Sequence, residues 1–556
     1  MKKFILVLSV LLVVAVGAYL YLRNTRLKVL EPYVKPKLND LVIKASDSLY
    51  HLTIEKFETD VTDSLILINA HLYPDTAVFA RMESQHKAPN DLFDVTVRRL
   101  AISELTPTAF AAGGVIDIGS LLIDNPVVKV WHKKQPYNVG EENDSSRTIY
   151  QQIQKDIRRI KVDAVRLNDV DFIYTNKNRG NKQTRLLNIN LLFTDILLDS
   201  TTQFDHGRFF FTKTGQINLK NYTLNTDDGL YQFSVRNIGI QTHTKEIQLS
   251  GLQLKPRLSK KNFYKQVKVS KDIYELAIGQ VNLSEVDWWS SMAEESLLVH
   301  KAELKKGEIK IYKDRSMPSE PGSKLGKYPH QLLVKAPLQM NIDSVQLSDV
   351  DVAYTELNPK SGQEGTIRFN RVNGTLEHVT NIQEEIKKKP FCTIRARASF
   401  MNKTPLKARF VLDLLHAQKG NFQVDVSMGA ISGADLNSIT VPLGLVKINS
   451  LNLKSLDASI KGNNYAATGT VKLLYNDLNI TALKEAGDTL KKRGLLSFIA
   501  NTFVLKKENP QAGKPVRVEP AGWQRDTQKS FFNLVWKTVF SGAAKTIGYK
   551  VKKERI

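Results

Sequence analysis

At 556 residues, the chain is longer than one compact core usually is, so several domains or a repeat array is expected. Its 42% apolar content excludes a disordered chain. The 79 basic and 56 acidic residues give a net charge of +23, which favours polyanionic partners such as anionic lipid surfaces, lipopolysaccharide or nucleic acid. Because the basic residues are spread along the chain without an arginine and aromatic RNA-binding pattern, we favour membranes and expect no nucleic-acid partner.

Residues 1–23 have the composition of a membrane anchor. Lys2 and Lys3 precede an uncharged run from Phe4 to Leu22. At ~1.5 Å per residue this run spans roughly 28 Å, close to the hydrocarbon thickness of a bilayer. Since no clear cleavage site follows it, we expect an uncleaved signal anchor, with a cleaved signal peptide as the alternative. The body is expected to be translocated, because long domains cross largely regardless of charge.

Residues 24–115 are predicted to form a linker helix and a β lead-in. The helix is indicated by apolar residues at helical spacing, including Leu38, Val42 and Leu49. From Leu52 onward the period changes to two, which is typical of strands.

The most informative pattern is a fifteen-residue template that recurs along the chain. In Ile160–Tyr174 the apolar residues alternate with period two, with two steps of three, and Asn168-Asp169 at the second step is turn chemistry. This predicts a strand, a turn or bulge, and a second strand. Its apolar positions are Ile160, Val162, Val165, Leu167, Val170, Phe172 and Tyr174.

The template recurs in four further segments, which are 116–130, 297–311, 340–354 and 446–460. The first four copies form two pairs, with starts about 44 residues apart within a pair and about 180 between pairs. We therefore predict an internal duplication. The expected modules are a first β-repeat module at 116–296, a second at 297–445 and a final β unit at 446–483.

Residues 484–556 are predicted to be a basic, amphipathic helical region. Within it, residues 527–549 place apolar and aromatic side chains on one helical face, with lysines around them. This pattern is typical of a helix at a membrane interface, and a helix that caps the end of the sheet is the alternative. The expected interface residues are Phe532, Trp536, Val539 and Phe540.

A search for catalytic chemistry finds no known motif. The sequence contains no H-E-x-x-H, G-x-S-x-G, Walker or G-x-G-x-x-G pattern, its ten histidines lack ligand spacing, and Cys392 is its single cysteine. The repeated D-V-D at Asp169/Asp171 and Asp349/Asp351 is best explained as the solvated face of a strand. We predict no enzymatic activity, no catalytic residue, no metal and no cofactor.

The alternation predicts sheets with one apolar face that the few helices cannot cover. Either two sheets pack as a sandwich, or one curled sheet keeps an apolar lining that holds an apolar ligand. For the second case the predicted groove residues are the repeated apolar positions Val165, Leu167, Phe172, Val345, Leu347 and Val352.

The sequence resembles the AsmA-like family of bacterial envelope proteins. The resemblance rests on the MKK-plus-anchor start, the repeated I-x-V-x-x-V-x-L-x-D-V-x-F-x-Y units and the ending GTVKLLYNDLNITAL…GLLSFIANTFVL, and it covers nearly the whole chain. Such proteins are β-rich, anchored in the inner membrane with a periplasmic body, and related to TamB and to bridge-like lipid-transfer proteins. The resemblance implies a mainly β fold, in which an N-terminal transmembrane helix precedes an elongated, curled antiparallel sheet with a groove and a few short amphipathic helices. It also implies a role in outer-membrane lipid homeostasis.

We therefore expect a single-pass inner-membrane protein that binds and helps transfer phospholipid or another acylated lipid. Its expected partners are that lipid, the inner membrane and outer-membrane components. The alternative is a non-enzymatic scaffold or assembly factor for outer-membrane proteins.

Overall fold

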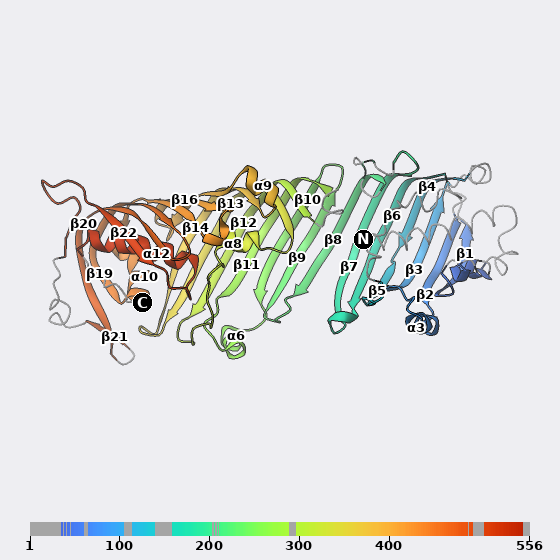
Figure 1. Ribbon diagram of the computed structural model, residues 1–556, viewed down its shortest axis with the longest axis horizontal. Helices are drawn as coiled ribbons and strands as arrows, with labels where there is room; N and C mark the ends of the chain where they lie inside the picture. The colour runs from blue at the N-terminus through green and yellow to red at the C-terminus, as the bar shows by residue number, and fades with distance from the viewer. Residues whose placement is uncertain are drawn as a thin grey trace. The chain divides into compact units, whose positions relative to one another are not determined.

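Strands make up most of the chain in the computed structural model (Figure 1). The structure describes residues 35–36, 38–40, 42–44, 46–59, 65–104, 114–138, 158–202, 205, 208, 211–288, 296–486, 489–492 and 505–548. The prediction of a mainly β chain with a curled sheet and a few short helices is confirmed. The predicted anchor lies outside the described residues, and so does the run GLLSFIANTFVL at residues 494–505 apart from Leu505. No helix in the described part is long and apolar enough to cross a bilayer.

The chain divides into two compact units. The first comprises residues 1–222 and 236–247, and the second comprises residues 223–235 and 248–556. The division therefore falls inside the predicted first repeat module. Strands β8 (Thr212–Asn225), β9 (Tyr231–Gln241) and β10 (Glu246–Pro256) lie where the two units divide the chain.

The first unit is a mixed sheet around one hydrophobic core. Its elements are β1 (Tyr50–Thr59), β2 (Leu65–Pro74), α3 (Thr76–Ser84), β3 (Asp91–Ser103), β4 (Val115–Asp124), β5 (Val127–His132), β6 (Arg159–Asn176), η1 (Lys177–Arg179) and β7 (Lys182–Leu198). Strands β1, β2 and β3 are antiparallel neighbours, and β3 pairs with both β4 and β5. Before β1, residues 38–40 and 42–44 are helical, and Leu38 and Val42 are buried in the core.

After β10, the second unit continues with three long strands. They are β11 (Ile273–Val286), β12 (Ser296–Asp314) and β13 (Gln339–Asn358). The remaining strands are β14 (Gln363–Thr380), β15 (Phe391–Phe400), β16 (Thr404–Asp413), β17 (Phe422–Met428), β18 (Ile431–Ser432), β19 (Val446–Gly462), β20 (Ala466–Ala486), β21 (Thr489–Lys492) and β22 (Val518–Gln524). From β13 to β17 each strand is antiparallel to the next, and β19, β20 and β22 continue the sheet.

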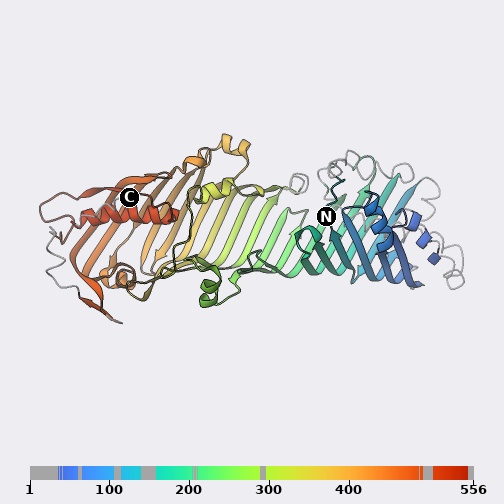
Figure 2. The same ribbon diagram turned by 60° about the horizontal axis from the view of Figure 1, so that its bottom comes forward.

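The helices of the second unit are short. They are α6 (Lys260–Val267), α8 (Pro329–Val334), α9 (Gln383–Lys388), η2 (Ala417–Lys419), α10 (Gly433–Gly444) and α12 (Phe531–Thr546). Figure 2 shows α12, in red, lying across the strands that end the chain. The predicted helical region 484–556 thus also contributes β21 and β22.

The expectation of a purely antiparallel sheet is wrong. β4 and β5 run parallel to β6, and β12 runs parallel to β13. The connections between these parallel pairs, at residues 133–158 and 315–338, have the length that a crossover requires. The alternation of apolar residues is the same for both strand directions, so it could not distinguish them.

The parallel pairs are the repeat copies themselves, placed side by side in register. In the first unit Leu121 pairs with Val165 and Ile123 with Leu167. In the second unit Leu304 pairs with Leu347, and Ile309 with Val352. Equivalent positions of two copies are therefore direct neighbours in the sheet.

The later copy of each pair, at 160–174 and at 340–354, is one continuous strand rather than two strands joined by a turn. β6 and β13 run through the predicted break, with register shifts on either side of Val170 and Val350. Asp169 and Asp349 adopt φ of 51° and 57° at these bulges. A bulge turns the strand enough to bring the step of three back to the same face.

Candidate functional site

The predicted groove residues of the first copy lie in a closed core. Val165 and Leu167 are 3% and 1% exposed, and Phe172 packs against the same cluster. That cluster draws its buried side chains from β1 to β6 and from the helical residues before β1. These three residues therefore offer little free surface for a ligand.

The equivalent residues of the second copy lie on a more open apolar face. Val345, Leu347 and Val352 of β13 are half-buried, and the intervening template position Val350 is 3% exposed. Leu304, the neighbour of Leu347 on β12, is half-buried as well. The duplication therefore gives one pair of strands whose apolar side is sealed and one whose apolar side is partly accessible.

A row of small residues continues from Leu347 across the sheet. Leu347 pairs with Gly374, which pairs with Ala396, and Ala396 pairs with Ala408. All three small residues are half-buried. On β16, Ala408 lies between Leu406 and Phe410, which share its face by alternation. We call Gly374, Ala396 and Ala408 the floor, and the strip of apolar face that they cross the apolar channel.

Glycine at position 374 is required by the close approach of the neighbouring strand. A Cβ atom there would lie 2.4 Å from the Arg395 carbonyl oxygen. A side chain at this position would therefore force β14 and β15 apart.

Two helices cover other parts of the apolar side of this sheet. α12 packs on β19, β20 and β22, where a Cβ on Gly542 would lie 2.7 Å from the Val471 side chain. α10 packs on β13, β14 and β19, and its Leu443 side chain leaves no room for a Cβ on Gly365. Gly542 and Gly365 thus allow both helices to lie directly on the strands.

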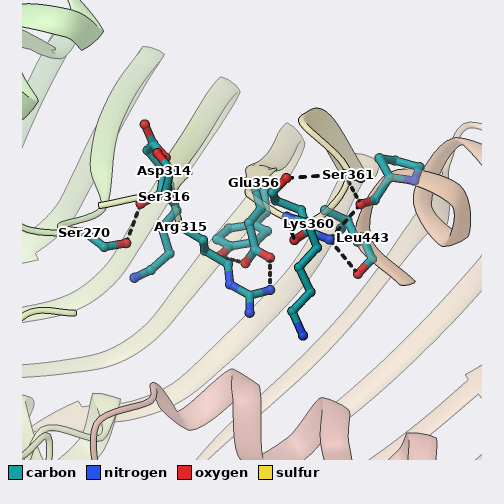
Figure 3. A network of polar contacts seen from close by, with 12 residues as sticks. Ser270, Asp314, Arg315, Ser316, Glu356, Lys360, Ser361 and Leu443 are labelled. Atoms are coloured by element: carbon teal, nitrogen blue, oxygen red, sulfur yellow. Dashed lines mark hydrogen bonds and ion pairs between the residues drawn. The ribbon is translucent and has the colours of Figure 1, made fainter. Parts of the chain in front are cut away.

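A polar network fixes α10 at the ends of the long strands (Figure 3). The Asn358 side-chain amide donates to the carbonyl oxygens of Pro442, at 2.9 Å, and Leu443. The Ser361 hydroxyl donates to the same Pro442 carbonyl at 2.7 Å.

The same network joins β12 to β13. Arg315, directly after β12, donates to Glu356 of β13 at 2.8 Å (Figure 3), and the Tyr354 hydroxyl donates to the other carboxylate oxygen at 3.0 Å. Burial, together with the Glu356 charge, raises the pKa of Tyr354, so the phenol stays protonated as a donor. These contacts tie β12, β13 and α10 to one another.

Helix α12 has one face buried against the sheet and one exposed face. Leu534 and Val535 are buried in the core, as a capping helix requires. Phe532, Trp536 and Phe540, spaced by four residues, are 61%, 57% and 38% exposed. Val539, the fourth predicted interface residue, is half-buried and packs against the core. We call the three exposed aromatic residues the aromatic ridge.

No candidate metal centre is found among the described residues. These residues include no group of three or more His, Cys, Asp or Glu side chains that could hold a metal ion. Cys392 is buried, and burial raises the pKa of its thiol to about 11, which keeps the thiolate population small at neutral pH.

Comparison of the sequence with models of known protein families, and with curated proteins, found no match.

The sequence indicated the large residues of the open face but not its channel. Ala396 and Ala408 alternate with larger inward residues, which are Ile394, Leu406 and Phe410, and this contrast is the signal that could have identified the floor. The pairing of these two alanines depends on the register, which their own sequence does not specify.

Proposed function

We propose that this chain is a membrane-anchored envelope protein that binds phospholipid or another acylated lipid and helps transfer it between membranes. The observation that carries the proposal is the half-buried apolar face of the second unit, with the small-residue floor Gly374, Ala396 and Ala408. An acyl chain laid on this floor would remove its methylene groups from water, at about 0.8 kcal/mol for each buried CH₂. A hydrocarbon chain needs no polar partner, which agrees with the lack of polar side chains at these positions.

The proposed location is the inner membrane, with the body in the periplasm. It is supported by the uncharged run from Phe4 to Leu22 and by the resemblance to AsmA-like proteins. In this proposal the protein contributes to lipid homeostasis of the outer membrane.

The aromatic ridge of α12 supports a second contact with lipid. Exposed Phe and Trp side chains on a helix with Lys537 and Lys545 are typical of a helix at a membrane interface. Because the opposite side of α12 is packed on the sheet, the ridge could contact a bilayer without unfolding of the helix.

The proposal is tested by mass spectrometry of lipid that co-purifies with the full-length protein. Ala408→Trp would fill the channel floor and is expected to lower the bound lipid per protein severalfold. Thr366→Trp, on the opposite face of β14, adds a tryptophan without entering the channel and is the matched control. Absence of lipid from the wild-type protein, or equal lipid content in all three proteins, would contradict the proposal.

A further inference from the structure

The other face of the same strands forms a hollow lined by charged residues. The hollow has a volume of about 1100 Å³ and extends from β12 to β22. Most of these strands contribute two polar residues on either side of one apolar or small residue, for example Arg395 and Arg397 around Ala396. By alternation, the polar side chains point into the hollow and the intervening ones point to the apolar face.

The charge in this hollow is unbalanced. Its lining includes six basic residues and three acidic residues, the latter being Glu303, Asp425 and Asp457. No Phe, Tyr or Trp side chain is among the lining residues.

Four of the basic residues form like-charged pairs directly across two strands. Arg395 of β15 pairs with Arg409 of β16, and Arg397 pairs with Lys407. Directly opposite residues of an antiparallel pair have Cβ atoms roughly 5 Å apart, and like charges placed there destabilise the sheet. We call these four side chains the cationic quartet.

Acidic neighbours compensate only half of the quartet. Arg395 forms an ion pair with Glu377 at 2.8 Å, and Arg409 forms one with Asp425 at 3.5 Å. Arg397 and Lys407 are exposed, and the part of the chain that the structure describes provides no ion pair for either. Two adjacent cations are thus free to bind an external anion.

We propose that the cationic quartet binds a phosphate-bearing anion, with Arg397 and Lys407 as its principal ligands. Arginine suits this role because its planar guanidinium can donate two hydrogen bonds to one phosphate, and lysine adds a compact charge. Compact phosphate groups fit better than nucleic acid, because the lining lacks the aromatic side chains on which bases stack. The site lies on the face opposite the apolar channel and goes beyond the proposed lipid binding there.

The same phosphate chemistry occurs in a free diphosphate and in an anionic lipid headgroup. The test therefore has two arms, both with the full-length protein in detergent or in vesicles. Calorimetry measures inorganic pyrophosphate binding, and flotation measures binding to phosphatidylcholine vesicles with and without phosphatidylglycerol.

The informative variant is the double substitution Arg397→Gln and Lys407→Gln. We expect the double variant to bind pyrophosphate, phosphatidylglycerol vesicles or both at least about tenfold more weakly than the wild-type protein does. We also expect the ligand-free variant to unfold at a higher temperature than wild type, because a like-charged pair has been removed. Loss of binding together with a gain in stability distinguishes a ligand site from a merely structural role.

The matched control is Lys447→Gln with Lys461→Gln, which removes the same charge at exposed positions of β19 outside the hollow.

The two probes distinguish the source of the phosphate. Pyrophosphate binding alone identifies a soluble anion, and vesicle binding that depends on phosphatidylglycerol identifies a headgroup. Either result supports the site if the quartet variant loses this binding and the control variant keeps it. Equal losses in both double variants would show a general charge effect and overturn the proposal. Unchanged binding in the quartet variant, or binding of an oligonucleotide but of neither probe, would also overturn it. Because lipid at the channel is measured separately with Ala408→Trp, failure of one proposal leaves the other intact.

Discussion

The Asp171 carboxylate accepts a hydrogen bond from the backbone N–H of Asn188 on the neighbouring strand, with an Oδ1–N distance of 3.1 Å. Asn188 has a φ of 56° and lies at a bulge in β7. In the second copy, Asp351 makes the same contact with the N–H of Arg371 at 2.7 Å, and Arg371 has a φ of 50°. The second aspartate of each D-V-D motif therefore supports a bulge in the partner strand.

The first aspartate of each motif completes the arrangement. The N–H of Asp169 donates to the side-chain oxygen of Asn190, and the N–H of Asp349 donates to that of Asn373, each at 3.1 Å. Both N–H groups would otherwise lack a ladder partner at the bulge. The prediction of a solvated face is thus incomplete, because these polar residues hold the backbone.

Asp171→Ala is expected to lower the free energy of unfolding by about 1 kcal/mol, since it removes a charge-assisted hydrogen bond at a partly exposed site. Asp171→Asn, which retains an acceptor oxygen, should lose less. Chemical denaturation measures both. Asp163→Ala, on the same strand, removes only an exposed ion pair with Lys161 and is the control; an equal effect of Asp163→Ala would contradict this role.

Gly307 occupies the slot where the other four copies carry Pro126, Val170, Val350 and Leu456. A Cβ there would lie 2.9 Å from the Ile278 side chain and 3.0 Å from that of Val350. Gly307→Val is expected to destabilise the second unit by about 1–3 kcal/mol through overpacking, and Gly307→Ala by less. Thermal unfolding checks this order, and a neutral Gly307→Val would show that the strands can separate freely at this point.

The burial of His330 on α8 should make the free energy of unfolding sensitive to acid. His330 is 1% exposed, neither ring nitrogen has a hydrogen-bond partner among the described residues, and burial lowers its pKa from 6.5 to about 4. Between these pH values the unfolded chain binds a proton that the folded chain does not, so stability falls as pH falls from 6.5 towards 4.

His330→Gln should remove this term, which amounts to roughly 2–3 kcal/mol at pH 4.5. Denaturation at pH 7 and pH 4.5 measures the difference between wild type and variant. His243→Gln, at an exposed position, is the control. If wild type and His330→Gln lose equal stability on acidification, the histidine is not buried in neutral form.

The aromatic ridge predicts membrane contact without a cost in stability. Trp536→Ala combined with Phe540→Ala removes exposed rings, so the unfolding free energy should change by less than about 1 kcal/mol. Binding of vesicles at this helix should weaken. Vesicles should shift the tryptophan fluorescence of the wild-type protein to the blue, and this shift should be smaller in the variant, which lacks Trp536 but keeps the other four tryptophans. An unshifted spectrum and unchanged vesicle binding would argue for a helix that only caps the sheet.

Period-two alternation was sufficient to predict the strands and the repeat. Ile160, Val162, Val165 and Leu167 alternate because one side of β6 is buried, and this requirement acts on the local sequence. The spacing of the copies even matches the register in which they pair, as Leu121 with Val165 and Leu304 with Leu347 show.

Direction and accessibility depend on distant residues and were not predictable. The sequence of β12 does not indicate that its neighbour β13 is parallel to it. The connection between the two strands contains 24 residues, from Arg315 to Leu338, so the direction of β13 is not set by a short turn. Similarly, Val165 and Val345 occupy the same template position, but the residues that cover the first belong to other strands of its unit. The accessibility of the candidate site therefore depends on tertiary packing and not on the local sequence.

Photo-crosslinking at position 347 tests the lipid-binding account most directly. A photoreactive amino acid replaces Leu347 on the apolar face in the full-length protein, and a second protein carries it at Ala353, on the opposite face of β13 and outside the charged hollow. We predict acyl-lipid adducts at position 347 and few or none at position 353, as measured by mass spectrometry. Equal labelling at the two positions, or no lipid adduct at position 347, would contradict the account.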